Sequence, residues 1–233
     1  MTKVFPNATS FKEVDQPNQP LAIDHGGNLD GGPVVLTVWK KSLLFNCDGF
    51  TVFDAEGNLV FRVDNYMSGA KGEIVLMDAS GKSLLTIRRK RLSIADNWLV
   101  FAGEEAVNPR FSVRKQVNFL NSRSLAQVSC LSCCDSGSPS SPCSSSSPKK
   151  KLVYEIEGSY KQRCCAVYDD KRRRVAEIKR KEAVGGLVFG LDVFRLIVLH
   201  EPGSRIESAV AMALVIVLEQ MFGSSSYSPR ALH

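Results

Sequence analysis

The apolar positions of this chain fall, from Val34 onward, into short runs that are either continuous or alternate with polar residues. Runs of this kind, bounded by Gly, Pro, Asp and Ser, are typical of β-strands. No helical pattern separates consecutive runs over most of the chain, so the sequence favours an antiparallel sheet or barrel over βαβ units. The predicted strands are Val34–Trp39, Phe50–Asp54, Leu59–Asp64, Glu73–Met77, Leu84–Arg88, Trp98–Ala102, Phe111–Val117, Leu152–Ile156, Cys164–Tyr168, Val175–Ile178, Leu187–Phe189 and Val193–Leu199.

A short turn motif recurs between these runs. Val52–Gly57 (VFDAEG) is repeated as Leu76–Gly81 (LMDASG), and a degenerate third copy is Val167–Lys171 (VYDDK). Asp opens such turns by binding nearby backbone amides with its side chain, and Gly takes the left-handed position. Each copy therefore predicts a tight hairpin.

The last apolar segment predicts a helix that is hydrophobic on every side. Ala209–Leu218 is an unbroken apolar run, and Ser204–Glu207 before it matches a capping box, so we expect a helix over Arg205–Phe222. The uncharged stretch has only eleven residues, whereas a membrane span needs about 20. A helix without a polar stripe must be enclosed by the rest of the protein.

A closed barrel threaded by this helix accounts for both patterns, and closure also removes exposed strand edges. The expected fold class is mainly β: a closed antiparallel barrel of about twelve strands around one central hydrophobic C-terminal helix. We expect residues 1–33 to form an irregular lead-in, 34–222 a single barrel domain and 223–233 a flexible tail. Twelve of the 26 residues in Ser122–Ser147 are Ser, which predicts a disordered insert over 122–150.

The ordered series of runs resembles the LURP-one-related family, whose fold is similar to the tubby C-terminal domain and to the phospholipid scramblases. The resemblance covers about residues 34–222, apart from the Ser-rich insert. The segments that carry it are Leu36–Ser42, Asp48–Asp54, Gly57–Asp64, Leu84–Lys90, Asp192–Gly203 and a closing helix of the type Leu214–Gln220.

This resemblance implies a twelve-stranded tubby-like barrel in a plant protein with a role linked to defence or to membranes. It implies no enzyme activity and supplies no active-site residues. The tubby analogy suggests phosphoinositide binding and membrane association. That step is an analogy of fold, and fold alone does not fix function.

Positive charge is concentrated in a few clusters. The chain has 30 Lys and Arg against 24 Asp and Glu, a net charge of +6, and the segment from Lys149 to Lys181 alone holds 12 basic and 5 acidic residues. Such clusters attract anionic lipid head groups, and they attract nucleic acid phosphates equally. A solvated strand face is the plainest interpretation. The candidate binding residues are Arg88, Arg89, Lys90, Arg91, Lys171, Arg172, Arg173, Arg174, Lys179, Arg180 and Lys181.

The sequence offers no set of catalytic groups. It has three His residues, far apart, and no nucleophile elbow, zinc-protease or phosphate-loop motif. The seven Cys residues, an odd number, fit neither a zinc finger nor a disulfide framework, which favours a reducing intracellular compartment. We expect no catalytic residue, no metal and no cofactor.

The expected function is therefore that of a non-enzymatic LURP-one-related protein that binds anionic phospholipid or a protein partner through a basic barrel surface. The alternative is a nucleic-acid-associated or membrane-tethered transcription regulator. The expected location is the cytoplasm, peripheral at a membrane, with the nucleus as the alternative.

Overall fold

The structure is a computed structural model that describes residues 32–43, 48–65, 72–93, 96–105, 107–116, 123–131, 151–183, 189–200 and 206–223. These residues form twelve strands and one helix. The elements are β1 (Val34–Trp39), β2 (Asp48–Phe53), β3 (Leu59–Asn65), β4 (Glu73–Asp78), β5 (Ser83–Arg89), β6 (Asn97–Ala102), β7 (Pro109–Lys115), β8 (Ser124–Cys130), β9 (Lys151–Ser159), β10 (Cys164–Asp169), β11 (Arg174–Arg180), β12 (Val193–Val198) and α1 (Ser208–Phe222).

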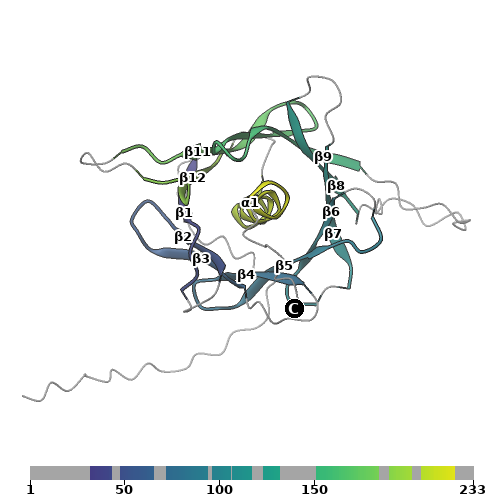
Figure 1. Ribbon diagram of the computed structural model, residues 1–233, viewed down its shortest axis with the longest axis horizontal. Helices are drawn as coiled ribbons and strands as arrows, with labels where there is room; N and C mark the ends of the chain where they lie inside the picture. Colours follow the sequence, from purple (N-terminus) through teal and green to yellow (C-terminus); the bar gives the residue numbers. More distant parts are fainter. Residues whose placement is uncertain are drawn as a thin grey trace, which may run out of the picture.

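The strands follow one another around a single closed barrel (Figure 1). Each strand pairs antiparallel with its neighbours in sequence, and β1 closes the ring by pairing with β12 from Val34↔Val198 to Trp39↔Val193. This confirms the predicted closed antiparallel barrel. Because successive strands alternate in direction, successive connections lie at opposite ends of the barrel.

The helix α1 occupies the centre of the ring (Figure 1). Every residue from Val210 to Leu218 is buried, and the alternate inward side chains of the strands, such as Leu36 and Val38 of β1, join it in one core. Burial of each Leu, Ile or Val side chain contributes about 1.5–3 kcal/mol. The all-round hydrophobic helix is thus the centre of the core, as its sequence predicted.

The helix begins later than the sequence indicated. Its N-cap is Glu207, in an extended conformation and without a side-chain capping bond, so the predicted start at Arg205 was wrong. Glu207 therefore lies outside the helix, where it cannot serve as the third helical residue of a capping box. Ser204 lies outside the described residues. Enclosure by the barrel supplies the stability that a cap would have added.

One strand was missed. Ser124–Cys130 forms β8, so the predicted disordered insert cannot begin at Ser122. The burial of its residues alternates as in other strands: Ser124, Ala126 and Val128 are buried, and the residues between them are half-buried. The high Ser content of the segment hid this alternation in the sequence. Phe189, the last residue of the predicted strand Leu187–Phe189, is not in a strand, and the other two residues of that segment lie outside the described residues. The predicted lead-in before residue 32, the rest of the predicted insert over residues 132–150 and the predicted tail after residue 223 also lie outside them.

The recurring turn motif forms three alike hairpin turns. The Oδ1 atoms of Asp54, Asp78 and Asp169 accept backbone N–H bonds from the residue four positions on, at 2.7, 2.9 and 2.8 Å. Gly57 and Gly81 have φ of +87° and +91°, and in the degenerate copy Arg172 takes the left-handed position with φ +62°. The hydrogen bonds from Asn58 and Ser80 hold the pKa of Asp54 and Asp78, respectively, below the ordinary value.

Two contacts between β7 and the helix segment show which end of the barrel is which. Arg110 at the start of β7 pairs with Glu207 before α1, 3.3 Å apart, whereas Lys115 at the end of β7 donates from Nζ to the carbonyl of Met221, 3.0 Å away. We call the end where α1 begins the entry end and the end where α1 finishes the exit end. Connections after odd-numbered strands lie at the exit end, and those after even-numbered strands lie at the entry end.

Candidate functional site

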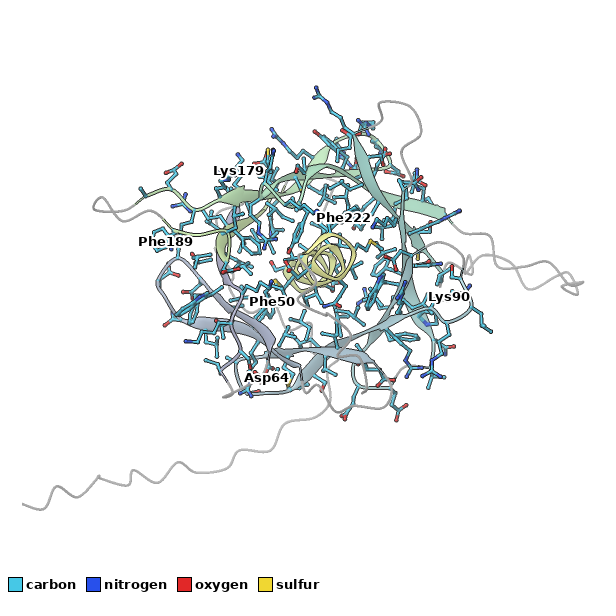
Figure 2. All side chains as sticks on the ribbon, viewed as in Figure 1. Phe50, Asp64, Lys90, Lys179, Phe189 and Phe222 are labelled. Carbon is cyan, nitrogen blue, oxygen red and sulfur yellow. The ribbon has the colours of Figure 1, made fainter. Side chains whose placement is uncertain are left out.

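The predicted basic residues do not form one patch. Arg88–Arg91 lie at the end of β5, Lys171–Arg174 in the β10–β11 turn and the start of β11, and Lys179–Lys181 at the end of β11. In the closed order β5 and β11 are six strands apart in either direction. Lys90 and Lys179 accordingly lie on opposite walls (Figure 2). The first and third groups share the exit end, and Lys171–Arg174 lie at the entry end.

Most of these side chains already have carboxylate partners on the barrel wall. Arg172, for example, reaches Glu155 and Glu157 at 2.8 and 2.9 Å, and its charge is therefore matched within the protein. Six of the eleven predicted residues are paired in this way. The pairs are Arg88–Glu73, Arg89–Asp96, Arg172 with Glu155 and Glu157, Arg173–Asp169, Arg174–Glu177 and Lys179–Glu177.

The other five have no ion pair with any residue that the structure describes. Lys90 and Arg91 are exposed in the connection after β5, and Lys171 is exposed in the β10–β11 turn. Arg180 donates from Nε to the carbonyl of Gln162, and Lys181 lies 3.4 Å from the hydroxyl of Thr37. Four of these five residues, all except Lys171, lie at the exit end.

Charge is segregated along the barrel axis, which the sequence analysis missed. Within the described ranges, exposed cations without an ion pair at the exit end are Lys41, Lys90, Arg91, Arg114, Arg123, Lys161 and Arg180. The matching exposed carboxylates at that end, among the side chains that the structure describes, are Glu182 and Asp192. The entry end has Lys82, Lys151 and Lys171 against Glu56, Glu104, Glu105 and Asp170. Among the described residues, exposed cations therefore outnumber exposed carboxylates at the exit end and not at the entry end.

Exposed apolar side chains gather at the same end. Four of the six large hydrophobic residues that are most exposed among those described lie at the exit end: Trp39, Leu43, Leu92 and Leu191, exposed by 43%, 53%, 106% and 46%. The other two, Val107 and Leu152, lie at the entry end. The exit end thus combines basic and apolar groups.

A buried ion network underlies the exit end. Glu219 in the last turn of α1 accepts Lys40 Nζ at 2.9 Å and Arg163 at 3.2 Å, and the Arg163 and Glu219 side chains are only 7% and 8% exposed. Burial alone raises the pKa of Glu219, but the Lys40 and Arg163 cations outweigh it, so the pKa lies below its ordinary value. Cations here also face the negative end of the helix dipole.

Arg163 is held by more than charge. Its guanidinium lies 4.2 Å from the ring centre of Tyr160 and 4.4 Å from that of Phe194, and its Nε donates to the carbonyl of Leu191 at 2.8 Å. Arg163 adopts a left-handed backbone with φ +52° in the β9–β10 turn. Burial, with Glu219 second, raises the pKa of Tyr160 well above its ordinary value. The network therefore fixes several exit-end turns to the helix.

No catalytic centre emerges from these groups. Across the ranges that the structure covers, no cluster of three or more His, Cys, Asp or Glu residues could hold a metal ion. Cys164 is exposed, whereas Cys165 next to it is buried, and burial raises the pKa of its thiol to about 12. None of the helical segments described is both long and apolar enough to cross a membrane.

Comparison with known proteins places the barrel among related sequences. A family model described as LURP-one-related matches residues 34–219. The chain is 55% identical to Protein LURP-one-related 8 of Arabidopsis thaliana over 229 residues, which cover 97% of this chain and 100% of the relative. It is 40% identical to LURP-one-related 12 of the same plant, over 81% of this chain and 78% of that protein.

A solved structure has the same fold. An Arabidopsis thaliana protein determined by X-ray crystallography superposes with a TM-score of 0.56, covers 82% of this chain and 91% of its own, and is 21% identical. At that identity the likeness concerns the fold only.

Proposed function

The chain belongs to the LURP-one-related family, and we propose that it is a non-enzymatic protein that binds anionic phospholipid head groups through the exit end of its barrel. The observation that carries this proposal is the segregation of charge. Exposed cations without an ion pair number seven at the exit end, against two exposed carboxylates, among the residues described.

The expected attraction is substantial. A basic residue near an anionic leaflet contributes about 1 kcal/mol, so several such residues facing one surface give useful affinity. The six predicted residues with wall carboxylates contribute less, because their charge is already compensated. Arg172–Arg174 are in this class and lie at the entry end. The predicted residues that remain for binding are therefore Lys90, Arg91, Arg180 and Lys181, which lie on two sides of the exit end.

The same cations would attract nucleic acid phosphates, and a protein partner with an acidic face is a further competitor. Two features favour a membrane. The basic end is the one that carries exposed Trp39, Leu92 and Leu191, and side chains of this type suit a bilayer interface. Nucleic acid readers instead place a basic helix or strand face in a groove, and the one helix described here is buried in the core.

Co-sedimentation with vesicles tests the proposal. Native protein should pellet with phosphatidylcholine vesicles that contain phosphoinositide or phosphatidylserine, and not with phosphatidylcholine alone. Binding should weaken strongly between about 50 mM and 0.5 M salt because exposed charges are screened. A parallel titration with a duplex of random sequence measures the nucleic acid alternative.

A matched pair of variants locates the site. Lys90→Glu/Lys161→Glu changes two exposed, unpaired lysines at the exit end and should abolish low-salt pelleting. Lys82→Glu/Lys171→Glu makes the same charge change at the entry end and should leave pelleting intact. Equal loss in both variants, or binding to the duplex but not to vesicles, would contradict the proposal.

A further inference from the structure

Building on that function, we propose that one arc of the exit end inserts apolar side chains into the bilayer interface. We call this arc the lip. It consists of the β9–β10 turn (Tyr160–Arg163), Arg180 and Lys181 at the end of β11, the turn Phe189–Asp192, and Trp39–Leu43 at the end of β1. The inserting residues are Trp39, Leu43 and Leu191. The lip therefore gives membrane binding a component that salt does not remove.

The lip is one continuous structure, because hydrogen bonds join turns that are distant in sequence. Arg180 Nε donates to the carbonyl of Gln162 at 3.0 Å, and Arg163 Nε donates to that of Leu191 at 2.8 Å. The amide of Lys40 donates to the carbonyl of Asp192 at 2.7 Å. The turns of three separate connections therefore form a single rim beside the β1–β12 junction.

Cations lie beside aromatic rings at two places on this rim. Lys41 Nζ lies 5.3 Å from the ring centre of Trp39, and Lys181 Nζ lies 5.1 Å from that of Phe189. Trp39 and Leu191 are each nearly half exposed, although their backbones flank the same β1–β12 junction. Trp prefers the head-group region because its ring is apolar and its N–H is polar, and Lys bends toward phosphates while its stem stays in apolar surroundings.

The lip is also rigid, so inserting it needs little ordering. Arg163 holds the Leu191 carbonyl and at the same time pairs with buried Glu219 of α1, while Lys40 pairs with the other Glu219 oxygen. Two turns of the lip are thus tied to the core helix. A preorganised surface of this kind loses less conformational entropy on binding than a flexible loop.

A second copy of the chain is a poorer occupant. In a two-fold dimer the lip would face another lip, which would bring the excess cations of two exit ends together. Beside Lys41, Lys161, Arg180 and Lys181, the exposed carboxylates of this end among the residues described are Glu182 and Asp192. An anionic bilayer complements this charge, and its interior accepts the apolar side chains.

Tryptophan fluorescence reports insertion directly, because the chain has two Trp residues and the other, Trp98, is 7% exposed in the barrel wall. In the Trp98→Phe variant, Trp39 is the single fluorophore. With phosphatidylserine vesicles its emission should shift to the blue, and lipids brominated on the acyl chain should quench it. If Trp98→Phe does not fold, the difference between native protein and Trp39→Phe gives the same signal.

Salt resistance provides the second measurement. Leu43→Ser/Leu191→Ser should retain low-salt pelleting but lose roughly ten-fold or more of the binding that remains at about 0.5 M salt. Val107→Ser/Leu152→Ser, which changes two large exposed apolar residues described at the entry end, is the matched control and should bind as the native protein does at both salt concentrations.

The outcomes separate the lip from the function on which it rests. If native protein fails to pellet with anionic vesicles at low salt, the proposed function fails and the lip fails with it. If it pellets but Trp39 is neither shifted nor quenched, and the two leucine substitutions change nothing at high salt, the lip is overturned while electrostatic binding stands. A dimer in sedimentation velocity that Leu43→Ser/Leu191→Ser dissociates would instead make the lip a self-association surface.

Discussion

Arg163 and Glu219 form a buried ion pair that joins the β9–β10 turn to the last turn of the central helix, with 3.2 Å between the guanidinium and carboxylate atoms. The pair connects residues 56 positions apart in the chain. It anchors the end of the helix just below the lip. It also provides a test of how much the helix end contributes to stability.

Removing this carboxylate should destabilise the fold. Glu219→Ala leaves the Arg163 guanidinium buried without its partner and frees Lys40, which should lower the free energy of unfolding by about 3 kcal/mol. Urea denaturation followed by circular dichroism measures the change. The control is Glu207→Ala at the other end of the helix, whose pair with Arg110 is largely exposed and should be worth less than about 1 kcal/mol. Equal effects would disprove a special role for the buried pair.

The same carboxylate should make stability depend on pH. Because Lys40 and Arg163 keep the pKa of Glu219 in the folded protein below its ordinary value, the unfolded chain takes up the proton first as pH falls. The contribution is therefore complete above the unfolded value of about 4.3 and is lost as pH falls through the folded pKa. The melting temperatures of the native protein and of Glu219→Gln, measured from about pH 6 to about pH 3, should therefore converge as the pH falls, because this range spans the ordinary pKa of Glu. A constant difference over this range would contradict the assignment.

The central helix should tolerate no charge in its middle. Val215 is fully buried in the hydrophobic core, and Val215→Asp would place a carboxyl group among apolar side chains. Even a protonated carboxyl that is buried without a hydrogen-bond partner costs several kcal/mol, a large part of the roughly 5–15 kcal/mol that stabilises a typical domain, so we expect insoluble or unfolded protein. Val107→Asp at an exposed site is the control. A soluble Val215→Asp variant with a normal melting transition would refute the enclosed helix.

Neighbouring cysteines should differ sharply in reactivity. Cys164 is exposed at the exit end, whereas burial raises the pKa of Cys165 to about 12, which leaves almost no thiolate at neutral pH. At about pH 8, close to the ordinary pKa of a thiol, iodoacetamide should therefore modify Cys164 in the native protein. It should modify Cys165 only after unfolding. Mass spectrometry of Cys164→Ser and Cys165→Ser distinguishes the two sites. If iodoacetamide labels Cys165 in the folded Cys164→Ser variant, the prediction is wrong and the barrel opens locally at β10.

The missed strand explains why the functional end could not be assigned from the sequence. In a barrel whose strands alternate in direction, the end at which a turn lies depends on the number of strands before it. Overlooking β8 reverses this assignment for the turns that follow, including those at Lys171 and Arg180. The buried positions of β8 are Ser124, Ala126 and Val128, and since two of the three are small or polar, apolar content alone did not reveal the strand.

By itself the sequence determined the local and periodic features. The turns at Asp54, Asp78 and Asp169, most strand positions and the all-round hydrophobic helix all follow from interactions within a few residues or from periodic burial, and the closed barrel follows from the need to enclose that helix. Only the tertiary structure decided which charges remain unpaired. Whether Arg172 meets Glu155, or Arg163 meets Glu219, depends on strand register and on the path of the helix, and so do the basic exit end and the lip. Such pairings join residues distant in the chain, and no local pattern encodes them.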